Sequence, residues 1–150
     1  MRVEPKQTMF VVIEYDKENE RLFLINKELI KVPSALDFPE KLKYIRTCVL
    51  DILREYDIEH AGIRIAESNS QNLNITRLHI EGVIQESFAS STVKKYFAGV
   101  KSSIAARLGM KTSDLANIID GKQSYNIEGW DELSNKTSKE AALVAIGAMK

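Results

Sequence analysis

The sequence predicts an α/β domain in which helices flank a mixed five-stranded sheet, built from a three-stranded antiparallel meander and two further strands. Three observations favour this fold class. Apolar, β-branched or alternating segments come first, at 8–16, 20–26 and 29–32, with a polar turn after the first. Residues 38–56 then repeat apolar side chains at spacings of mostly three and four, which places them on one stripe of a helix. After this helix, short strands alternate with helices, as in sheets that contain parallel strands.

The second half of the chain continues this alternation. We expect a strand, a polar loop, a helix, a fifth strand, a helical region, a loop and a last helix, at 61–66, 68–74, 75–85, 86–90, 91–119, 121–129 and 138–149. The helix at 75–85 is apolar on more than one face, so we expect it to be buried, with His79 as a core histidine. Gly82 in its middle predicts a close approach of the helix to the sheet.

The length of 150 residues suits one domain, and we assign residues 8–150 to it and 1–7 to a flexible N-terminal segment. No apolar stretch is long enough to span a membrane, so no membrane partner is expected. The first residues lack the apolar core of a signal peptide, and Cys48 has no second cysteine to pair with. These features predict a soluble protein of the cytoplasm.

Charge is balanced over the whole chain but not along it. Lys and Arg together number 21, as do Asp and Glu, yet 87–113 contains no acidic residue. That run carries five cations, Lys94, Lys95, Lys101, Arg107 and Lys111. Phosphate is a common partner of such a basic segment, because each neutralised phosphate releases condensed counterions. The run therefore makes these five residues candidates for nucleic-acid binding, although a solvated amphipathic helix has the same pattern.

Several segments carry a resemblance to a known family. RLHIEGVIQ (77–85), followed by a short strand and SSTVKKYFAG (90–99), resembles Holliday-junction resolvases, a branch of the ribonuclease-H-like superfamily. The closing SKEAALVAIGA (138–148) is similar to their last helix. The resemblance implies a ribonuclease-H-like fold, branched or single-stranded DNA as partner, and a homodimer on a two-fold-symmetric junction. It also implies Mg²⁺ or Mn²⁺ as cofactor in an active enzyme.

The carboxylates that hold metal in that superfamily are altered in this sequence. Glu14 stands at the position expected for the first-strand Asp, and Arg64 stands where the fourth strand normally carries Glu. Since Arg cannot bind Mg²⁺, we interpret Glu14 and Arg64 as a structural ion pair on neighbouring strands, with metal-dependent cleavage lost and no cofactor. The alternative is an active Mg²⁺- or Mn²⁺-dependent endonuclease with a rearranged catalytic and metal site of Glu14, Glu67 and Glu140.

Two other functions remain open. Residues 102–122 look like a helix-turn-helix with Gly109 at the turn. This motif would place four side chains toward the major groove, those of Lys111, Thr112, Ser113 and Asn117. A purely protein-interaction domain is favoured by the net charge of zero, and it would have a protein as its partner.

Overall fold

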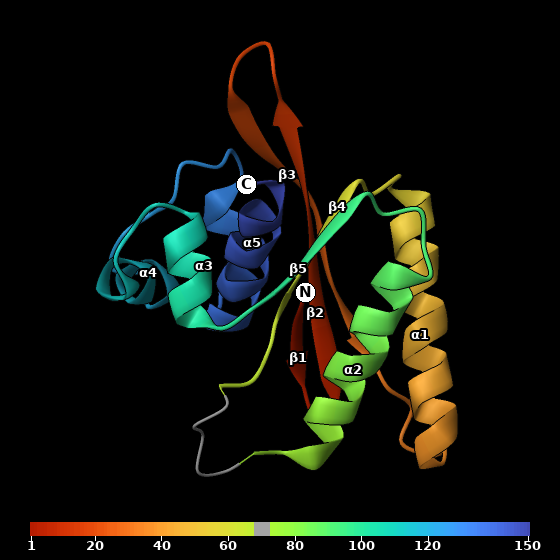
Figure 1. Ribbon diagram of the computed structural model, residues 1–150. Coiled ribbons are helices and arrows are strands. Elements are labelled where there is room, and N and C mark those ends of the chain that lie inside the picture. Colours follow the sequence, from red (N-terminus) through yellow and green to blue (C-terminus); the bar gives the residue numbers. More distant parts are fainter. Residues whose placement is uncertain (68–72) are drawn as a thin grey trace.

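The computed structural model describes residues 1–67 and 73–150, and its strands form one five-stranded sheet with helices on both faces (Figure 1). The strands are β1 (Arg2–Glu4), β2 (Gln7–Asp16), β3 (Arg21–Lys31), β4 (His60–Arg64) and β5 (Lys95–Gly99). Their order across the sheet is β3-β2-β1-β4-β5. Neighbours are antiparallel from β3 to β1 and parallel from β1 to β5. The predicted mixed sheet is confirmed.

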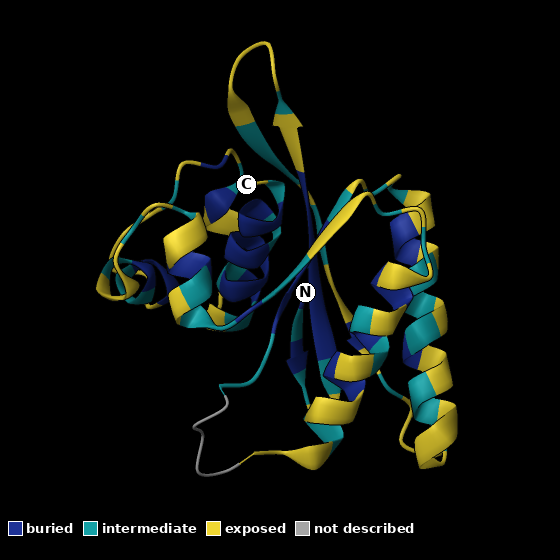
Figure 2. Cartoon of the chain, viewed as in Figure 1, coloured by how far each residue is buried: buried dark blue, intermediate teal, exposed yellow. Residues whose placement is uncertain are grey.

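Helices form a layer on each side of the sheet. One layer contains α1 (Phe38–Glu55) and α2 (Ile75–Ala89), and the other contains α3 (Lys101–Arg107), α4 (Thr112–Ile119) and α5 (Lys136–Met149). A short 3₁₀ helix, Trp130–Glu132, precedes α5. Each layer encloses its own hydrophobic core against the sheet, and Figure 2 shows the buried residues of the strands and of α5.

Strand alternation decides which side chains enter which core. Phe10 and Val12 of β2 join the core under α1 and α2, whereas Val11 and Ile13 join the core under α5. The same alternation places Val3 of β1 in the core under α1 and α2. The polar residues on either side of Val3 therefore point toward α5, and this geometry positions the site described below.

Helix α5 approaches β4 closely because the side chains on their facing surfaces are small. A Cβ atom on Gly62 would lie 2.4 Å from the carbonyl oxygen of Val144, so only glycine fits there. Ala141 and Ala142 are fully buried on α5. Asn135 begins the helix with a capping box that involves Ser138, which fixes the first turn beside the strand ends.

The first strand differs from the expectation. Residues 1–7, expected to be flexible, contain β1, which lies between β2 and β4, and Val3 is fully buried. A three-residue strand with a charged residue at each end is too short to show a hydrophobic period. The two strands expected at 20–26 and 29–32 are one strand, β3, which pairs with β2 across a register shift at Val12/Ile13.

The fifth strand lies further along the chain than the expected 86–90. It is Lys95–Gly99, and 86–90 instead belong to the end of α2 and its cap, because Ile84, Ser87 and Phe88 continue the buried stripe of the helix. Residues 68–72 of the expected polar loop lie outside the described residues.

One face of α2 is exposed, contrary to the expectation of a buried helix. His79 is exposed and meets the ring of Phe38 edge-on, and a Cβ on Gly82 would meet no atom within 4 Å. The core-histidine and close-approach predictions are therefore wrong.

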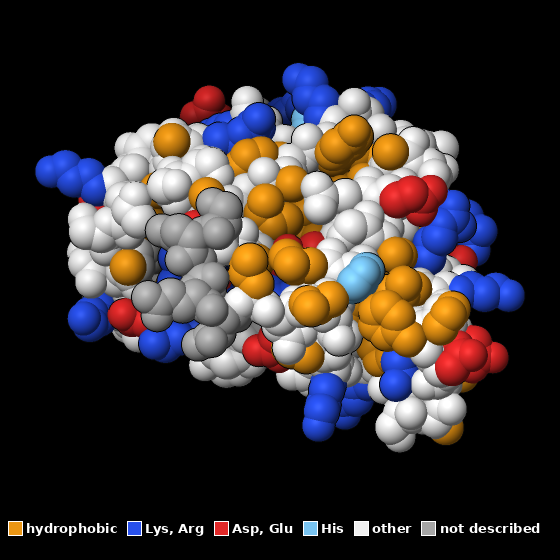
Figure 3. Space-filling model, turned by 60° about the horizontal axis from the view of Figure 1, so that its bottom comes forward, with side chains coloured by type: hydrophobic (Ala, Val, Ile, Leu, Met, Phe, Trp, Pro, Cys, Tyr) orange, Lys and Arg blue, Asp and Glu red, His pale blue; other side chains and the backbone are white. Residues whose placement is uncertain are grey.

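Apolar side chains of α1 and α2 line an open groove of about 610 Å³, and Figure 3 shows hydrophobic side chains gathered on the lower face of the molecule. None of the helices described is both long and apolar enough to cross a membrane.

Candidate functional site

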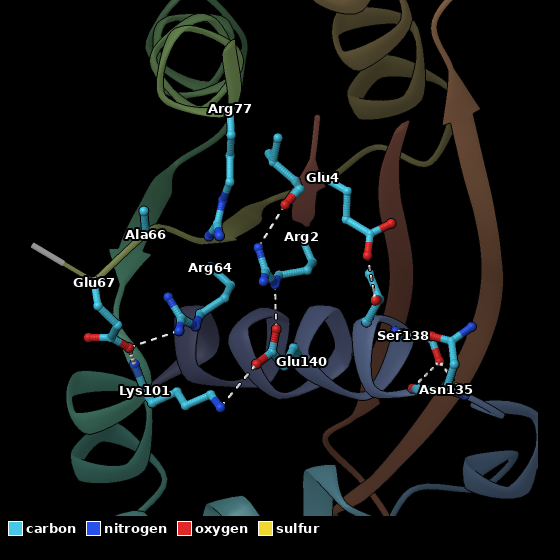
Figure 4. A network of polar contacts seen from close by, with 12 residues as sticks. Arg2, Glu4, Arg64, Ala66, Glu67, Arg77, Lys101, Asn135, Ser138 and Glu140 are labelled. Atoms are coloured by element: carbon cyan, nitrogen blue, oxygen red, sulfur yellow. Dashed lines mark hydrogen bonds and ion pairs between the residues drawn. The ribbon is translucent and has the colours of Figure 1, made fainter. Parts of the chain in front are cut away.

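Charged side chains converge where the parallel strands β4 and β5 end, beside the start of β1 (Figure 4). Arg2 of β1 lies opposite Arg64 of β4, Glu67 follows β4, and Lys101 follows β5. Glu140 of α5 completes the cluster from the helix layer. Ligands of open α/β sheets bind at the carboxyl ends of the strands, so the topology alone makes this edge a candidate site.

Glu140 is neutralised by two cations. The Nε of Arg2 donates a hydrogen bond to its Oε2, and the Nζ of Lys101 lies 3.7 Å from its Oε1. The carboxylate side chain is 9% exposed, so water contributes little to its stabilisation. This ion pair joins β1 to α5.

Arg64 is a buried cation, and within 1–67 and 73–150 it has one ion-pair partner, Glu67. Its Nη2 lies 2.8 Å from Oε1 of Glu67, and the same oxygen accepts a hydrogen bond of 3.1 Å from the backbone N–H of Lys101. Burial lowers the pKa of the Arg64 guanidinium, Glu140 and Glu67 act in the opposite sense, and Arg2 and Arg77 lower it further. A guanidinium stays protonated under all ordinary conditions, so the site holds a buried positive charge.

Arg77 reaches the same region from α2. Its Nε donates to Oε1 of Glu81 at 2.6 Å, and the other oxygen of Glu81 accepts the backbone N–H of Ala66 at 3.0 Å. Among the residues that the structure describes, Nε and Nη1 of Arg64 and Nη2 of Arg77 have no hydrogen-bond partner. The cluster therefore contains three buried donors that lack an acceptor.

The carboxylate that ends the true first strand is Glu4, which the sequence analysis missed. Its oxygens accept hydrogen bonds from Thr137 Oγ1 at 3.2 Å and from Gln7 Nε2 at 2.6 Å. This strand is too short to show a hydrophobic period, so the longer apolar run of β2 is the first strand that the sequence predicts.

The predicted ion pair between Glu14 and Arg64 is wrong. Glu14 is exposed on β2 opposite Phe23 of β3, and β1 separates β2 from β4. The error follows from the assignment of the first strand, because the neighbour of β4 is β1. Of the candidate catalytic residues, the structure brings Glu67 and Glu140 to Arg64 and leaves Glu14 elsewhere.

The cations of the basic run are spread over the molecule. Lys94 pairs with Glu59, and Lys95 begins β5, both at the opposite end of that strand from the site. Arg107 lies 4.2 Å from the centroid of the Phe97 ring, and Lys111 is exposed before α4. Only Lys101 of the five lies within the cluster.

The expected helical hairpin is present, but α4 is anchored by its apolar face. Gly109 has a φ of 70° in the turn between α3 and α4, a conformation that favours glycine. Leu115, Ile118 and Ile119 are buried in the core that α5 shares. Lys111 and Ser113 are exposed, so their proposed contact with a DNA groove stays a prediction.

The side chains of this cluster do not fit the metal ion that the resemblance implies. Within 1–67 and 73–150, no group of three or more His, Cys, Asp or Glu side chains is arranged to hold a metal. Glu67, Glu81 and Glu140 each pair with an Arg. The guanidinium of Arg64 repels an incoming cation and supplies no oxygen ligand.

Comparison with solved structures places the fold. The chain is similar to the Thermus thermophilus RuvC structure, with a TM-score of 0.70, 13% identity, and coverage of 97% of this chain and 89% of RuvC. T. thermophilus RuvC in complex with a Holliday junction substrate gives a TM-score of 0.65 at 12% identity, covering 97% and 88%. The fowlpox virus Holliday junction resolvase gives a TM-score of 0.46 at 15% identity, with coverage of 96% of this chain and 88% of the resolvase. The chain therefore has the fold of RuvC, and the expected ribonuclease-H-like fold is confirmed.

Comparisons by sequence found no relative. No family model matches the chain, and no curated protein matches it.

Proposed function

We propose that this chain is a resolvase-type domain that binds branched or single-stranded DNA and has lost metal-dependent cleavage. The observation that carries the proposal is Arg64, a buried guanidinium at the end of β4, in the cluster where the resembled nucleases hold metal with carboxylates. A cation at that position removes a ligand and opposes metal binding, while it favours a phosphate. The similarity of the fold to a RuvC bound to a Holliday junction supports DNA as the partner.

The remaining parts of the proposal concern the setting of the protein. We place it in the cytoplasm and expect it to act as a homodimer, as the resemblance implies. A protein partner remains an alternative in which the DNA contacts are absent. Sedimentation of the purified chain alone and with a four-way junction separates these states.

The direct test measures binding and cleavage on the same substrates. We expect the chain to bind a four-way junction more tightly than a duplex of equal length, with affinity that falls as salt rises, because phosphate contacts release counterions. With Mg²⁺ or Mn²⁺ we expect no cleavage of junction, duplex or RNA–DNA hybrid. Failure to bind any nucleic acid at low salt would refute the binding role.

Metal-dependent cleavage would instead support the rearranged nuclease. Cleavage that is abolished in Glu140→Gln and Glu67→Gln, with folding intact by circular dichroism, would make these residues ligands or catalysts. Glu14→Gln is the control, because Glu14 lies on β2 away from this cluster.

A further inference from the structure

The buried guanidinium group at the end of β4, that of Arg64, has fewer hydrogen-bond acceptors than it has donors. Arg64 is 4% exposed, yet its Nε and Nη1 have no partner among the described residues. Leaving a buried donor unsatisfied costs roughly 1–3 kcal/mol, and more for a charged group. The fold therefore holds a buried charge whose hydrogen bonds are incomplete.

A second arginine directs a donor with no partner toward the same place. Figure 4 shows the guanidinium of Arg77 extending from α2 toward those of Arg64 and Arg2. Arg77 Nη2 is buried and has no partner within the described part of the chain. Arg2 and Arg77 each lower the pKa of Arg64, so the three positive charges act on one another. Like charges held this close are stabilised by an anion between them.

The carboxylates of the cluster are already engaged. Glu81 is held by Arg77 and by the backbone of Ala66, and Glu140 is held by Arg2 and Lys101. Glu67 accepts from Arg64 Nη2 and from the N–H of Lys101 with one oxygen. None of these contacts uses the three donor nitrogens that lack a partner among the described residues, Nε and Nη1 of Arg64 and Nη2 of Arg77. An additional oxyanion would accept hydrogen bonds from them.

We propose that Arg64 and Arg77 form a binding site for a backbone phosphate of nucleic acid, at the position where the resembled nucleases hold metal. A phosphodiester offers two charged oxygens, which match the parallel N–H groups of a guanidinium. Lys101, 42% exposed at the mouth of the cluster, adds positive charge on the side of approach. This inference rests on the proposed function and identifies the group that the domain recognises.

The test removes the charge from the phosphate and from the protein in turn. A four-way junction is prepared with a single neutral methylphosphonate at each linkage near the crossover. The native chain should lose about tenfold in affinity at one or two linkages, the size expected for a charge-assisted contact. In Arg64→Met the same linkages should change affinity by less than about twofold, because the partner of the phosphate is gone.

Two further variants keep the test decisive. Arg77→Gln removes a donor from a side chain that is 18% exposed, and it serves if Arg64→Met fails to fold. Arg46→Gln removes one positive charge from an exposed ion pair between α1 and α2, so it should keep the full methylphosphonate effect. The inference would be overturned if native and Arg64→Met protein gave the same methylphosphonate profile. If the native chain still bound the junction with an intact salt dependence, the proposed function would stand.

Free phosphate is the other source of the same chemistry. Thermal unfolding of each protein is compared in inorganic phosphate and in sodium chloride at equal ionic strength. One outcome would overturn both nucleic-acid assignments and make this a site for a small anion. In that outcome the native chain binds no DNA, and phosphate stabilises the native chain but not Arg64→Met. Stabilisation of Arg64→Met equal to that of the native chain would also contradict a phosphate site at Arg64.

Discussion

The charged residues at the start of β1 and at the end of β4 each connect two parts of the fold. Arg2 and Glu140 join β1 to α5, and Arg77 with Glu81 joins α2 to the backbone after β4. Glu67 joins Arg64 to the start of α3, whose N-cap residue Val100 supplies no side-chain hydrogen bond. These carboxylates therefore tie neighbouring elements of the fold together.

The ion pair of Arg2 and Glu140 gives a stability prediction. Its side chains are 17% and 9% exposed, so Arg2→Met removes the direct hydrogen-bond donor of a buried carboxylate. We expect the free energy of unfolding to fall by about 3 kcal/mol in Arg2→Met, the range for breaking a buried pair. Urea denaturation measures this change.

A double-mutant cycle tests the cause of that loss. Arg2→Met combined with Glu140→Met should cost less than the sum of the two single changes, since the double variant leaves neither member of this pair without its partner. Arg54→Met is the control, because its pair with Asp51 is exposed at 81% and 55%, and it should change stability by less than about 1 kcal/mol. Additive costs for Arg2 and Glu140 would contradict this account.

At the scale of elements, the placement of α5 depends on one glycine of β4. Gly62→Ala would put a Cβ 2.4 Å from the carbonyl oxygen of Val144, so α5 and β4 must separate. We expect a loss of about 1–3 kcal/mol, as for other overpacked sites. The melting temperature should fall, and the contacts between Arg2 and Glu140 should weaken with it.

A second glycine provides the opposite expectation. Gly82 lies in the middle of α2 with open space where a Cβ would stand. Gly82→Ala should therefore raise stability by about 0.5–1 kcal/mol through helix propensity. Equal effects of the two substitutions in thermal unfolding would show that the approach of α5 to β4 is not a tight constraint.

The elements that the sequence predicted well are those with a long period or a clear cap. The period at 38–56 predicted α1, and the last helix was expected at 138–149, within α5. Both helices begin with capping boxes, at Asp37 and Asn135. The sequence could not locate β1 because three residues carry no period, and one of its two neighbours in the sheet, β4, is distant in sequence. That single error moved the expected first-strand carboxylate from Glu4 to Glu14. Arg64, Glu67 and Glu140 could be named from the sequence, but their pairing depends on tertiary contacts.

At the scale of the whole molecule, a net charge of zero conceals an uneven distribution. Lys94 and Lys95 lie at the start of β5, whereas Lys101 follows its end, roughly 13 Å or more away at strand geometry. Lys101 also faces Glu140, so it lies beside the arginine cluster. The basic run is therefore continuous in sequence but divided in space.

This division predicts unequal effects on DNA binding. Lys101→Gln should lower junction affinity and reduce the slope of log affinity against log salt by about one, the loss of one phosphate contact. The exposed Lys94 is already paired with Glu59, so Lys94→Gln should have a smaller effect on both quantities. Binding isotherms at several salt concentrations measure the slopes, with Lys95→Gln as a second variant at the same end of β5. A larger loss for Lys94→Gln and Lys95→Gln than for Lys101→Gln would place the DNA at the start of β5 and away from Arg64, because phosphate contacts act only at close range in physiological salt.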